Sequence, residues 1–402
     1  KEIEKIYCAP GNGGISADAE CVDIKATDKE NMVKFAKENA IDFCVVTPDD
    51  PLALGMVDVM EEAGIPCFGP KANAAIIEAS KAFSKDLMKK YGIPTADYET
   101  FDNEKDALHY IEEKNTFPIV IKADGLALGK GVLICETLDD AKTALREMMV
   151  EHVFGLSGNK VVVEEFMTGK EVSVLAFTDG NVVKPMISSM DHKRAYDNDE
   201  GLNTGGMGTI APSPYYTKEI AETCMETIFL PTVKAMNAEG RTFKGCLYFG
   251  LMLTPKGPRV VEYNCRFGDP ETQVVLPLLN SDLLTIMKAC HDGTLKDVDV
   301  VWSEEACACV VEASGGYPVK YEKGIPMYGF ENFKDKDGYY CFHAGTKFQD
   351  GQIVTNGGRV LGVTAKGATL KEARANAYAA TEWIDFANKY MRHDIGKAID
   401  EA

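Results

Sequence analysis

The sequence predicts a multidomain protein of the α/β and α+β classes, and three observations lead to that prediction. The chain has 402 residues, more than one hydrophobic core usually organises, which indicates two to four domains. Hydrophobic residues make up 45% and charged residues 26% of the chain, a balance typical of globular proteins rather than of disordered or fibrous ones. Short apolar runs alternate with helical patterns along residues 1–166, as in βαβ units.

The opening region, residues 1–78, predicts a parallel α/β domain. The apolar segments 3–8 and 42–47 have the length of buried strands, and the amphipathic segment 28–40 is the predicted helix between them. A second helix is expected over 54–64, followed by a third strand in the sequence PCFG. A series of this kind favours a parallel sheet with crossover helices.

Two helices, 70–79 and 81–91, are expected next, and the sequence Gly-Ile-Pro ends the second. Residues 97–166 alternate strands and helices in a small block bounded by loops, which indicates a mobile lid subdomain. From about residue 300 the chain shows three strand patterns and then a helix over 370–391. This last unit predicts a separate α+β cap.

Charge and composition exclude several classes of function. The net charge of −19 disfavours a nucleic-acid binder, because phosphate backbones require clustered Lys and Arg. No apolar run of about 18 residues is present, so no membrane span is expected, and the N-terminus lacks the apolar stretch of a secretory signal. The twelve cysteines form no zinc pattern, Cys307 and Cys309 being the only close pair, and are expected to be core thiols in a reducing cytoplasm.

The segment IVIKADGLALGKGV (119–132) combines a strand, a lysine and a glycine-rich loop. Glycines let backbone N–H groups approach an anion closely, and the lysines add positive charge. The pattern is neither a Walker A loop nor a Rossmann fingerprint. From these residues alone, a phosphate-binding loop and a plain glycine-rich hairpin both stay open.

The segment VVVEEFMTGKEVSV (161–174) is a hydrophobic strand that ends in two carboxylates, followed by a turn at Gly169 and a third carboxylate. The free backbone groups at such a strand end can pair with an adenine edge, and a carboxylate can accept hydrogen bonds from both ribose hydroxyls. A charged hairpin without a ligand explains the same pattern.

The segment VVEYNCRFGDPETQ (260–273) carries the sharpest pattern. Glu262, Asn264 and Arg266 are spaced i, i+2 and i+4, so on a strand they would share one face. Carboxylate and amide oxygens suit a magnesium ion held together with nucleotide phosphates, and a guanidinium can pair with a carboxylate or phosphate. The residues after Gly268 are expected to turn into a helix whose N-terminus favours anions.

Residues 190–214 are expected to form a long polar loop that binds substrate. The loop contains the basic sequence DHKR (191–194) and the glycine-rich sequence NTGGMG (203–208). His192 alone would be a weak indication, and the neighbouring charges strengthen it.

Together these motifs resemble the ATP-grasp superfamily and, more narrowly, the phosphoribosylamine–glycine ligase family. The resemblance extends in the family's order over nearly the whole chain, and the combination of NTGGMG with NCRFGDPET is highly specific. The matching segments are APGN (9–12), FGP (68–70), SKAFSKD (80–86), PTADY (94–98), VIKADGLALGKGV, VEEFMTGKE, DHKR, NTGGMG, VEYNCRFGDPETQ, FHAGT (342–346) and TNGGRVLGVTA (355–365).

The resemblance implies an ATP-grasp fold with a pre-ATP-grasp N-terminal domain (1–78), an ATP-grasp domain (79–300) that includes the lid (97–166), and a C-terminal domain (301–402). It also implies an ATP site with Mg²⁺ or Mn²⁺ held by Glu262 and Asn264. The residues expected to contact ATP are Lys81, Lys122, Gly125, Gly129, Lys130, Gly131, Glu164, Glu165, Phe166, Met167 and Glu171.

The implied reaction joins glycine to 5-phosphoribosylamine through glycyl phosphate, in purine biosynthesis, with release of ADP and phosphate. The residues expected to contact these substrates are Asp191, His192, Lys193, Arg194, Asn203, Thr204, Gly205, Gly206, Arg266, Asp269, Glu271 and Thr272. Those expected to act in catalysis are Lys122, Asp191, Lys193 and Arg266. We expect a cytoplasmic monomer without nucleic-acid or membrane partners.

The sequence departs from the family pattern in two places. Family members usually open with a strand and a GGGGREHA-like loop, whereas this sequence begins near the second strand, so that strand and loop are expected to be missing from it. The usual GPEAPL is TPDDPL here (47–52), which places a shorter carboxylate at Asp49. Two alternatives stay open, another ATP-grasp ligase such as a formate-using purine enzyme or a biotin carboxylase, and a non-catalytic nucleotide-binding protein.

Overall fold

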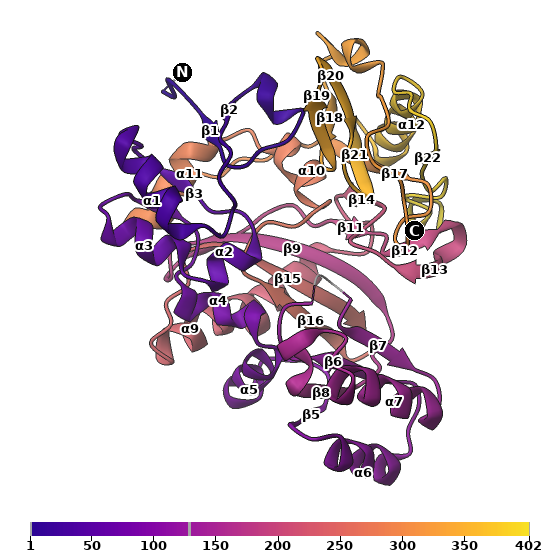
Figure 1. Ribbon diagram of the computed structural model, residues 1–402. Coiled ribbons are helices and arrows are strands. Elements are labelled where there is room, and N and C mark those ends of the chain that lie inside the picture. Colours follow the sequence, from indigo (N-terminus) through magenta and orange to yellow (C-terminus); the bar gives the residue numbers. More distant parts are fainter. Residues whose placement is uncertain (1, 128–129, 402) are drawn as a thin grey trace.

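A computed structural model describes residues 2–127 and 130–401 (Figure 1). In this view the N-terminal segment, in indigo, and the C-terminal strands, in orange and yellow, occupy the upper part, a sheet crosses the middle, and the strands and helices of residues 97–166 lie below. No helix among the described residues is long and apolar enough to cross a membrane.

The N-terminal region contains the expected helix but less sheet than predicted. Its strands form two separate parallel pairs, β1 (Tyr7–Cys8) with β2 (Glu20–Cys21) and β3 (Cys44–Val45) with β4 (Cys67–Phe68). The prediction of a buried strand over 3–8 was wrong for its first residues, because Ile3 and Ile6 are exposed. Only one edge of β1 is paired in the described sheet.

The helices of this region follow the sequence signals with one break. Helix α1 (Lys29–Glu38) begins after Asp28, whose carboxylate accepts a hydrogen bond from the Asn31 N–H and caps the helix. The helix expected over 54–64 is instead α2 (Asp49–Ala53) and α3 (Met56–Glu62). They are separated at Gly55, whose φ of +89° lies in the left-handed region that glycine tolerates.

Helices α4 (Ala72–Ala79) and α5 (Lys81–Tyr91) confirm the next prediction. Ser80 separates them, and its hydroxyl accepts a hydrogen bond from the Phe83 N–H, which caps α5. Helix α5 ends at Gly92, also in the left-handed region.

The predicted lid elements are all present. We call the antiparallel sheet in the order β5-β8-β6-β7 the lid sheet. Its core is a cluster of buried residues shared by the strands and the two covering helices. The elements are β5 (Tyr98–Phe101), α6 (Glu104–Lys114), β6 (Ile119–Ala123), β7 (Val132–Cys135), α7 (Leu138–Leu145), the π-helical turn Arg146–Val150, the 3₁₀ turn Gly155–Asn159 and β8 (Val161–Glu165).

The central sheet is antiparallel, in the order β10-β9-β15-β16. Its strands are β9 (Lys170–Thr178), β10 (Val183–Pro185), β15 (Gly245–Thr254) and β16 (Gly257–Asn264). The helices beside it are α8 (Lys218–Cys224), the π-helical turn Met225–Phe229, α9 (Leu230–Ala238) and α11 (Leu283–Asp292).

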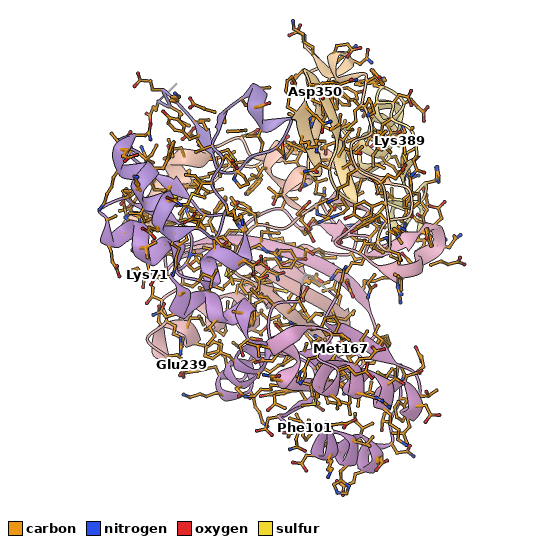
Figure 2. The ribbon with its side chains drawn as sticks, in the orientation of Figure 1. Lys71, Phe101, Met167, Glu239, Asp350 and Lys389 are labelled. Atoms are coloured by element: carbon orange, nitrogen blue, oxygen red, sulfur yellow. The ribbon has the colours of Figure 1, made fainter. Side chains whose placement is uncertain are left out.

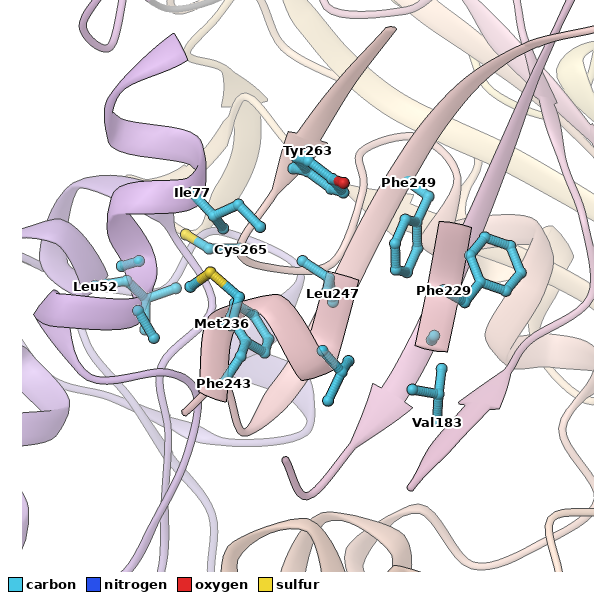
Figure 3. Packing of buried hydrophobic residues seen from close by; sticks show 14 of the residues in the cluster. Leu52, Ile77, Val183, Phe229, Met236, Phe243, Leu247, Phe249, Tyr263 and Cys265 are labelled. Atoms are coloured by element: carbon cyan, nitrogen blue, oxygen red, sulfur yellow. The ribbon is translucent and has the colours of Figure 1, made fainter. Parts of the chain in front are cut away.

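Alternate residues of the central strands enter two different cores. On one face Leu247 and Phe249 pack with Phe229 and Met236, and Figure 3 shows Ile77 of α4 beside this cluster. Each such large apolar side chain contributes about 1.5–3 kcal/mol when fully buried. The shared core therefore holds helix α4 rigidly against strand β16, and the ligand cleft is built on that contact.

The C-terminal sheet has the order β11-β14-β17-β21-β18, and β22 pairs with β17. Its strands are β11 (Met190–Asp191), β14 (Gly208–Ala211), β17 (Ala306–Ser314), β18 (Tyr339–His343), β21 (Arg359–Gly367) and β22 (Lys389–Tyr390). The remaining elements are the hairpins β12 (Arg194–Tyr196) with β13 (Glu200–Asn203) and β19 (Thr346–Gln349) with β20 (Gln352–Thr355), helices α10 (Thr272–Val275), α12 (Leu370–Thr381) and α13 (Ala398–Glu401), and 3₁₀ turns at Ile15–Ala17, Asp197–Asp199, Leu276–Leu278, Leu295–Asp297 and Phe330–Phe333.

Two predictions about this region were wrong. Residues 190–214 are not one long loop, because β11 and β14 are strands of the C-terminal sheet and β12 and β13 form a hairpin between them. The helix expected over 370–391 ends at Thr381, since the chain then turns back to pair β22 with β17. All twelve cysteines are free, and Cys307 and Cys309 are buried on β17.

Candidate active site

One cleft of about 1570 Å³ collects residues from the N-terminal region, the lid sheet, the central sheet and the C-terminal sheet. Figure 2 draws the side chains, and its labelled Met167, one of the lining residues, lies near the lid strands and the end of the central sheet. Most of the residues predicted to bind ligands line this cleft, although they are spread over almost two hundred positions of the chain. A cleft between domains of this kind is the default place for a ligand.

The three predicted site residues at the start of the 260–273 motif, Glu262, Asn264 and Arg266, all line the cleft. Glu262 and Asn264 are on the same face of β16, as predicted. Arg266 does not share that strand, because β16 ends at Asn264. Its guanidinium is placed instead by Glu78 of helix α4, whose Oε1 lies 3.0 Å from Arg266 Nη2.

Glu78 is one of the site residues that sequence reasoning missed. Its carboxylate also accepts a hydrogen bond of 2.8 Å from Asn264 Nδ2 and one of 2.7 Å from the backbone N–H of Cys265. The available signal was that Glu78 is an acidic residue inside the apolar helix segment ANAAIIEA. An acidic residue usually indicates an exposed position, so this signal did not select Glu78.

Three lysines of helix α5 and strand β6 line the cleft. Lys122 on β6 lies 3.0 Å from Glu164 Oε1 and donates a hydrogen bond to the Val261 carbonyl. Lys85, which the sequence analysis did not select, is also buried and lies 3.3 Å from the same Glu164 oxygen. Burial lowers the pKa of Lys85 to about 8, although Glu164 opposes that shift.

Lys81 completes this group at the first position of α5. Its ammonium donates a hydrogen bond of 3.1 Å to the Gly125 carbonyl, which ties the glycine-rich loop to the helix. Burial lowers the pKa of Lys81, with Glu262 opposing that shift and Lys122 adding to it. These three ammonium groups therefore lie among the carboxylates of Glu164 and Glu262, and they can also pair with phosphate oxygens.

The glycine-rich loop lies at the edge of the cleft. Leu126, Ala127 and Gly131 line it, whereas the backbone of Gly125 donates to the Ser157 carbonyl and Lys130 is exposed. Gly129 lies outside the described residues. Contacts of Gly125, Lys130 and Gly131 with ATP stay predictions.

The predicted adenine hinge follows strand β8. Glu164, Glu165, Phe166, Met167 and Glu171 all line the cleft. The carboxylate of Glu165 is engaged elsewhere, since it lies 2.7 Å from Arg259 Nη2 and accepts a hydrogen bond from the Asp97 N–H. Any contact of Glu165 with adenine would therefore come from its backbone.

The 190–206 segment supplies the opposite wall. Asp191, His192, Lys193, Arg194, Asn203, Thr204 and Gly205 line the cleft. His192 is buried, and its two ring nitrogens lie within hydrogen-bond distance of the Gly208 carbonyl and the Gly396 N–H. This geometry gives His192 a structural role and does not support its predicted substrate contact.

The C-terminal segment holds this wall in place. The fully buried Arg392 pairs with Asp394 at 2.8 Å and donates a hydrogen bond to the Arg194 carbonyl. Arg359, which sequence reasoning also missed, pairs with Asp269 at 3.1 Å and donates to the Gly205 carbonyl at 3.0 Å. Gly206 is held by the same arginine rather than facing the cleft.

Charged groups on this wall influence one another strongly. Lys193 lies 3.7 Å from both Glu171 and Glu262, and these carboxylates raise its pKa. Burial and the nearby Glu271 raise the pKa of Asp191. Burial also raises the pKa of Glu271, although Tyr248 donates it a hydrogen bond of 2.9 Å.

Asp269, Glu271 and Thr272 line the cleft as predicted, but the expected helix after Gly268 is the single turn α10. This turn is too short for a helix dipole to attract an anion strongly. Contacts of these three residues with substrate stay predictions.

The residues present suit a magnesium or manganese ion held jointly with a nucleotide. Burial opposes ionisation of Glu262, but Lys193, Lys122 and Lys81 outweigh it and lower the pKa of the carboxyl. Glu262 and Asn264 thus offer one charged and one neutral oxygen, the hard donors that such ions prefer. No group of three or more His, Cys, Asp and Glu side chains forms a metal cluster in residues 2–127 and 130–401, so phosphates and water would complete the coordination.

Three family models match successive parts of the chain. They are the phosphoribosylglycinamide synthetase N domain (residues 1–78), its ATP-grasp (A) domain (79–272) and its C domain (307–398). The chain belongs to the phosphoribosylglycinamide synthetase family. The match to the ATP-grasp domain includes the three lysines, the predicted adenine hinge and all but the last residue of the 260–273 motif.

Relatives named phosphoribosylamine–glycine ligase match almost the whole chain. The protein of Caldanaerobacter subterraneus is 49% identical over 98% of this chain and 93% of its own length. That of Clostridium acetobutylicum is 46% identical over 99% of this chain and 94% of its own length.

Solved structures give the same result for the fold. The phosphoribosylamine–glycine ligase of Thermotoga maritima is similar with a TM-score of 0.85, at 32% identity over 97% of this chain and 93% of that one. The biotin carboxylase domain of the Hydrogenobacter thermophilus 2-oxoglutarate carboxylase has a TM-score of 0.74 at 17% identity, over 96% of this chain and 86% of that one. The second likeness shows a shared ATP-grasp fold only.

Proposed function

We propose that this protein joins glycine to 5-phosphoribosylamine at the expense of ATP, giving glycinamide ribonucleotide, ADP and phosphate in purine biosynthesis. The observation that carries the proposal is the meeting of Glu262, Asn264, Lys81, Lys122 and Arg266 in one cleft. The names and near-complete coverage of the relatives support the choice of substrates.

In the first step the glycine carboxylate attacks the γ-phosphorus of ATP, which forms glycyl phosphate and releases ADP. Lys81 and Lys122 would neutralise charge on the phosphates and on the phosphoryl group as it is transferred. Glu262 and Asn264 would hold Mg²⁺ or Mn²⁺, which polarises phosphate oxygens when bound. Arg266 would pair with the carboxylate of glycine or with the acyl phosphate formed from it.

In the second step the amine of phosphoribosylamine attacks the acyl carbon and expels phosphate. The wall that contains Asp191 and Lys193 faces the same cleft and would position the amine. Closure of the lid would keep water away from the acyl phosphate. We further infer that the enzyme works as a cytoplasmic monomer on small-molecule substrates.

An ADP-release assay with each substrate omitted in turn tests this proposal. Release should require ATP, a divalent metal, glycine and phosphoribosylamine together. Release that depends on bicarbonate and biotin, or on formate, would assign the chain to another ATP-grasp reaction. Nucleotide binding without any release would contradict an enzymatic role.

The substitution Glu262→Ala tests the metal assignment. We expect kcat to fall by about 10³-fold or more, since the ion's help in phosphoryl transfer is worth several kcal/mol. Near-normal ligase activity in this variant would contradict the assignment. The parent protein at the same metal concentration is the control.

A further inference from the structure

The buried carboxylate of Glu78 gathers three donors from the motif that carries the proposed metal ligand. Oε1 lies 2.8 Å from Asn264 Nδ2 and 3.0 Å from Arg266 Nη2, and Oε2 lies 2.7 Å from the Cys265 nitrogen. The residue is only 7% exposed. A buried carboxylate is costly unless it is paired and hydrogen-bonded, and here both of its oxygens are used.

Glu78 is held rigidly. It is on helix α4, whose neighbours Ala74, Ala75 and Ile77 belong to the core shared with the central sheet. The three donors come from the end of strand β16 and the two residues that follow. A rigid acceptor therefore faces the point where the chain leaves the strand and enters the cleft.

The chemistry of this contact fixes the orientation of one amide. An ionised carboxylate only accepts hydrogen bonds, so Asn264 must turn its NH₂ group toward Glu78. Its Oδ1 is then free for the cleft, where a metal ion needs an oxygen and an NH₂ group would be repelled. The same carboxylate also anchors one arm of the Arg266 guanidinium.

We propose that Glu78 is a positioning residue that orients the Asn264 amide with its oxygen toward the metal and directs Arg266 into the cleft. This inference rests on the proposed nucleotide–metal site and does not depend on which substrates the enzyme joins. Glu78 itself lines the cleft, and in this proposal it acts through Asn264 and Arg266 rather than as a ligand of the metal.

The substitution Glu78→Gln tests the orientation directly. A glutamine has one acceptor oxygen in place of two, so it cannot accept from Asn264, Arg266 and the Cys265 N–H together, and the Asn264 amide would no longer be held with its NH₂ away from the metal. The measured quantity is the affinity of the protein for Mn²⁺ in the presence of a non-hydrolysable ATP analogue. Calorimetry and electron paramagnetic resonance both determine it. We expect Mn²⁺ affinity to fall about 10–100-fold, as is typical when the partner of a metal ligand is changed.

A second substitution distinguishes an effect on the orientation of the Asn264 amide from an effect on the contact between α4 and β16. In the double variant Glu78→Gln with Asn264→Asp, either rotation presents an oxygen to the metal, so Mn²⁺ affinity should recover at least tenfold. Because Asn264→Asp adds a negative charge at the metal whatever Glu78 does, the single variant Asn264→Asp is the reference, and Glu78→Gln should weaken Mn²⁺ binding less in that background than in the parent. A simple structural tie between α4 and β16 would give the same loss in both backgrounds. The matched control is Glu312→Gln, another buried glutamate that lies outside the cleft, and its Mn²⁺ affinity should equal that of the parent.

Unchanged Mn²⁺ affinity in folded Glu78→Gln would overturn the proposal, and so would a double variant as weak as the single one. If Glu78→Gln does not fold, Glu78→Asp keeps the acceptor on a shorter side chain and should show a smaller loss of Mn²⁺ affinity. An unchanged affinity there would overturn the proposal equally. Because neither glycine nor phosphoribosylamine is present in the assay, its outcome is independent of the ligase assignment.

Discussion

Two glutamates are buried against lysine in this protein, one in the cleft and one in the C-terminal sheet. Glu164 lies 3.0 Å from Lys122 and 3.3 Å from Lys85. Glu312 on β17 lies 3.4 Å from Lys389, whose ammonium also donates hydrogen bonds to two backbone carbonyls, those of Thr381 and Ile384. The cleft thus gathers two ammonium groups around one carboxylate, and the C-terminal sheet has one shared ammonium.

This difference indicates that the lysines around Glu164 serve to bind a ligand, whereas Lys389 beside Glu312 serves the fold. Around Glu164 two ammonium groups share one carboxylate, and burial, with the nearby charge of Lys122 adding to it, lowers the pKa of Lys85 although Glu164 opposes that shift. Around Glu312 burial outweighs Lys389 and raises the pKa of the carboxyl to about 7. The first arrangement gains most from a phosphate ligand, whereas the second only affects the free energy of unfolding.

Lys122→Met removes one of the two ammonium groups beside Glu164 and should give the largest effect on activity. Loss of a preorganised charge facing the phosphates is expected to lower kcat/KM for ATP by about 10²–10³-fold. Steady-state ADP release measures it. Lys389→Met is the matched control, and its KM for ATP should equal that of the parent. Equal kcat/KM values for ATP in the two variants would contradict a role of Lys122 in binding phosphate.

The lowered pKa of Lys85 predicts that the affinity for ATP depends on pH, an effect of intermediate size. A bound phosphate would stabilise its ammonium form, so affinity for ATP is full below the pKa of about 8 and falls as the proton is lost above it. We expect Kd for the ATP analogue to rise about fivefold between pH 8 and pH 9. Lys85→Arg, which stays charged, should flatten this rise. The same rise in both proteins would show that another group titrates.

Glu312→Gln should give the smallest effect, on stability alone. The folded state holds the Glu312 proton more tightly than the unfolded state, whose pKa is near 4.5. Its stabilising contribution is therefore present at acid pH and is lost as pH rises from about 4.5 through 7. The variant should be about 1–3 kcal/mol more stable than the parent at pH 8 by urea unfolding, with the gain shrinking toward pH 5. A gain that does not change with pH would contradict this assignment.

The sequence predicted best where the signal is local. The lid elements and helices α4 and α5 follow hydrophobic periodicity and turn residues such as Ser80 and Gly92, which act within a few positions. Glu262 and Asn264 were predicted together because a two-residue spacing on a strand puts both on one face.

Contacts between distant segments could not be predicted in this way. Glu78 and Asn264 are separated by 186 positions, and Arg359 meets Asp269 across 90 positions, so no pattern within either segment indicates the pairing. The same limit explains the 190–214 segment, whose polar composition predicted a loop although β14 pairs with β17.

The strands β11 and β14 make the last part of the chain a structural requirement for a wall of the cleft. Removing the residues after 300 would take away β17 and leave β14 with an open hydrogen-bonding edge, while Arg194 would lose the support of Arg392. A shortened protein of this kind would present an aggregation-prone strand edge. Dissecting this protein into separately expressed pieces should therefore preserve residues 190–211 together with the C-terminal sheet.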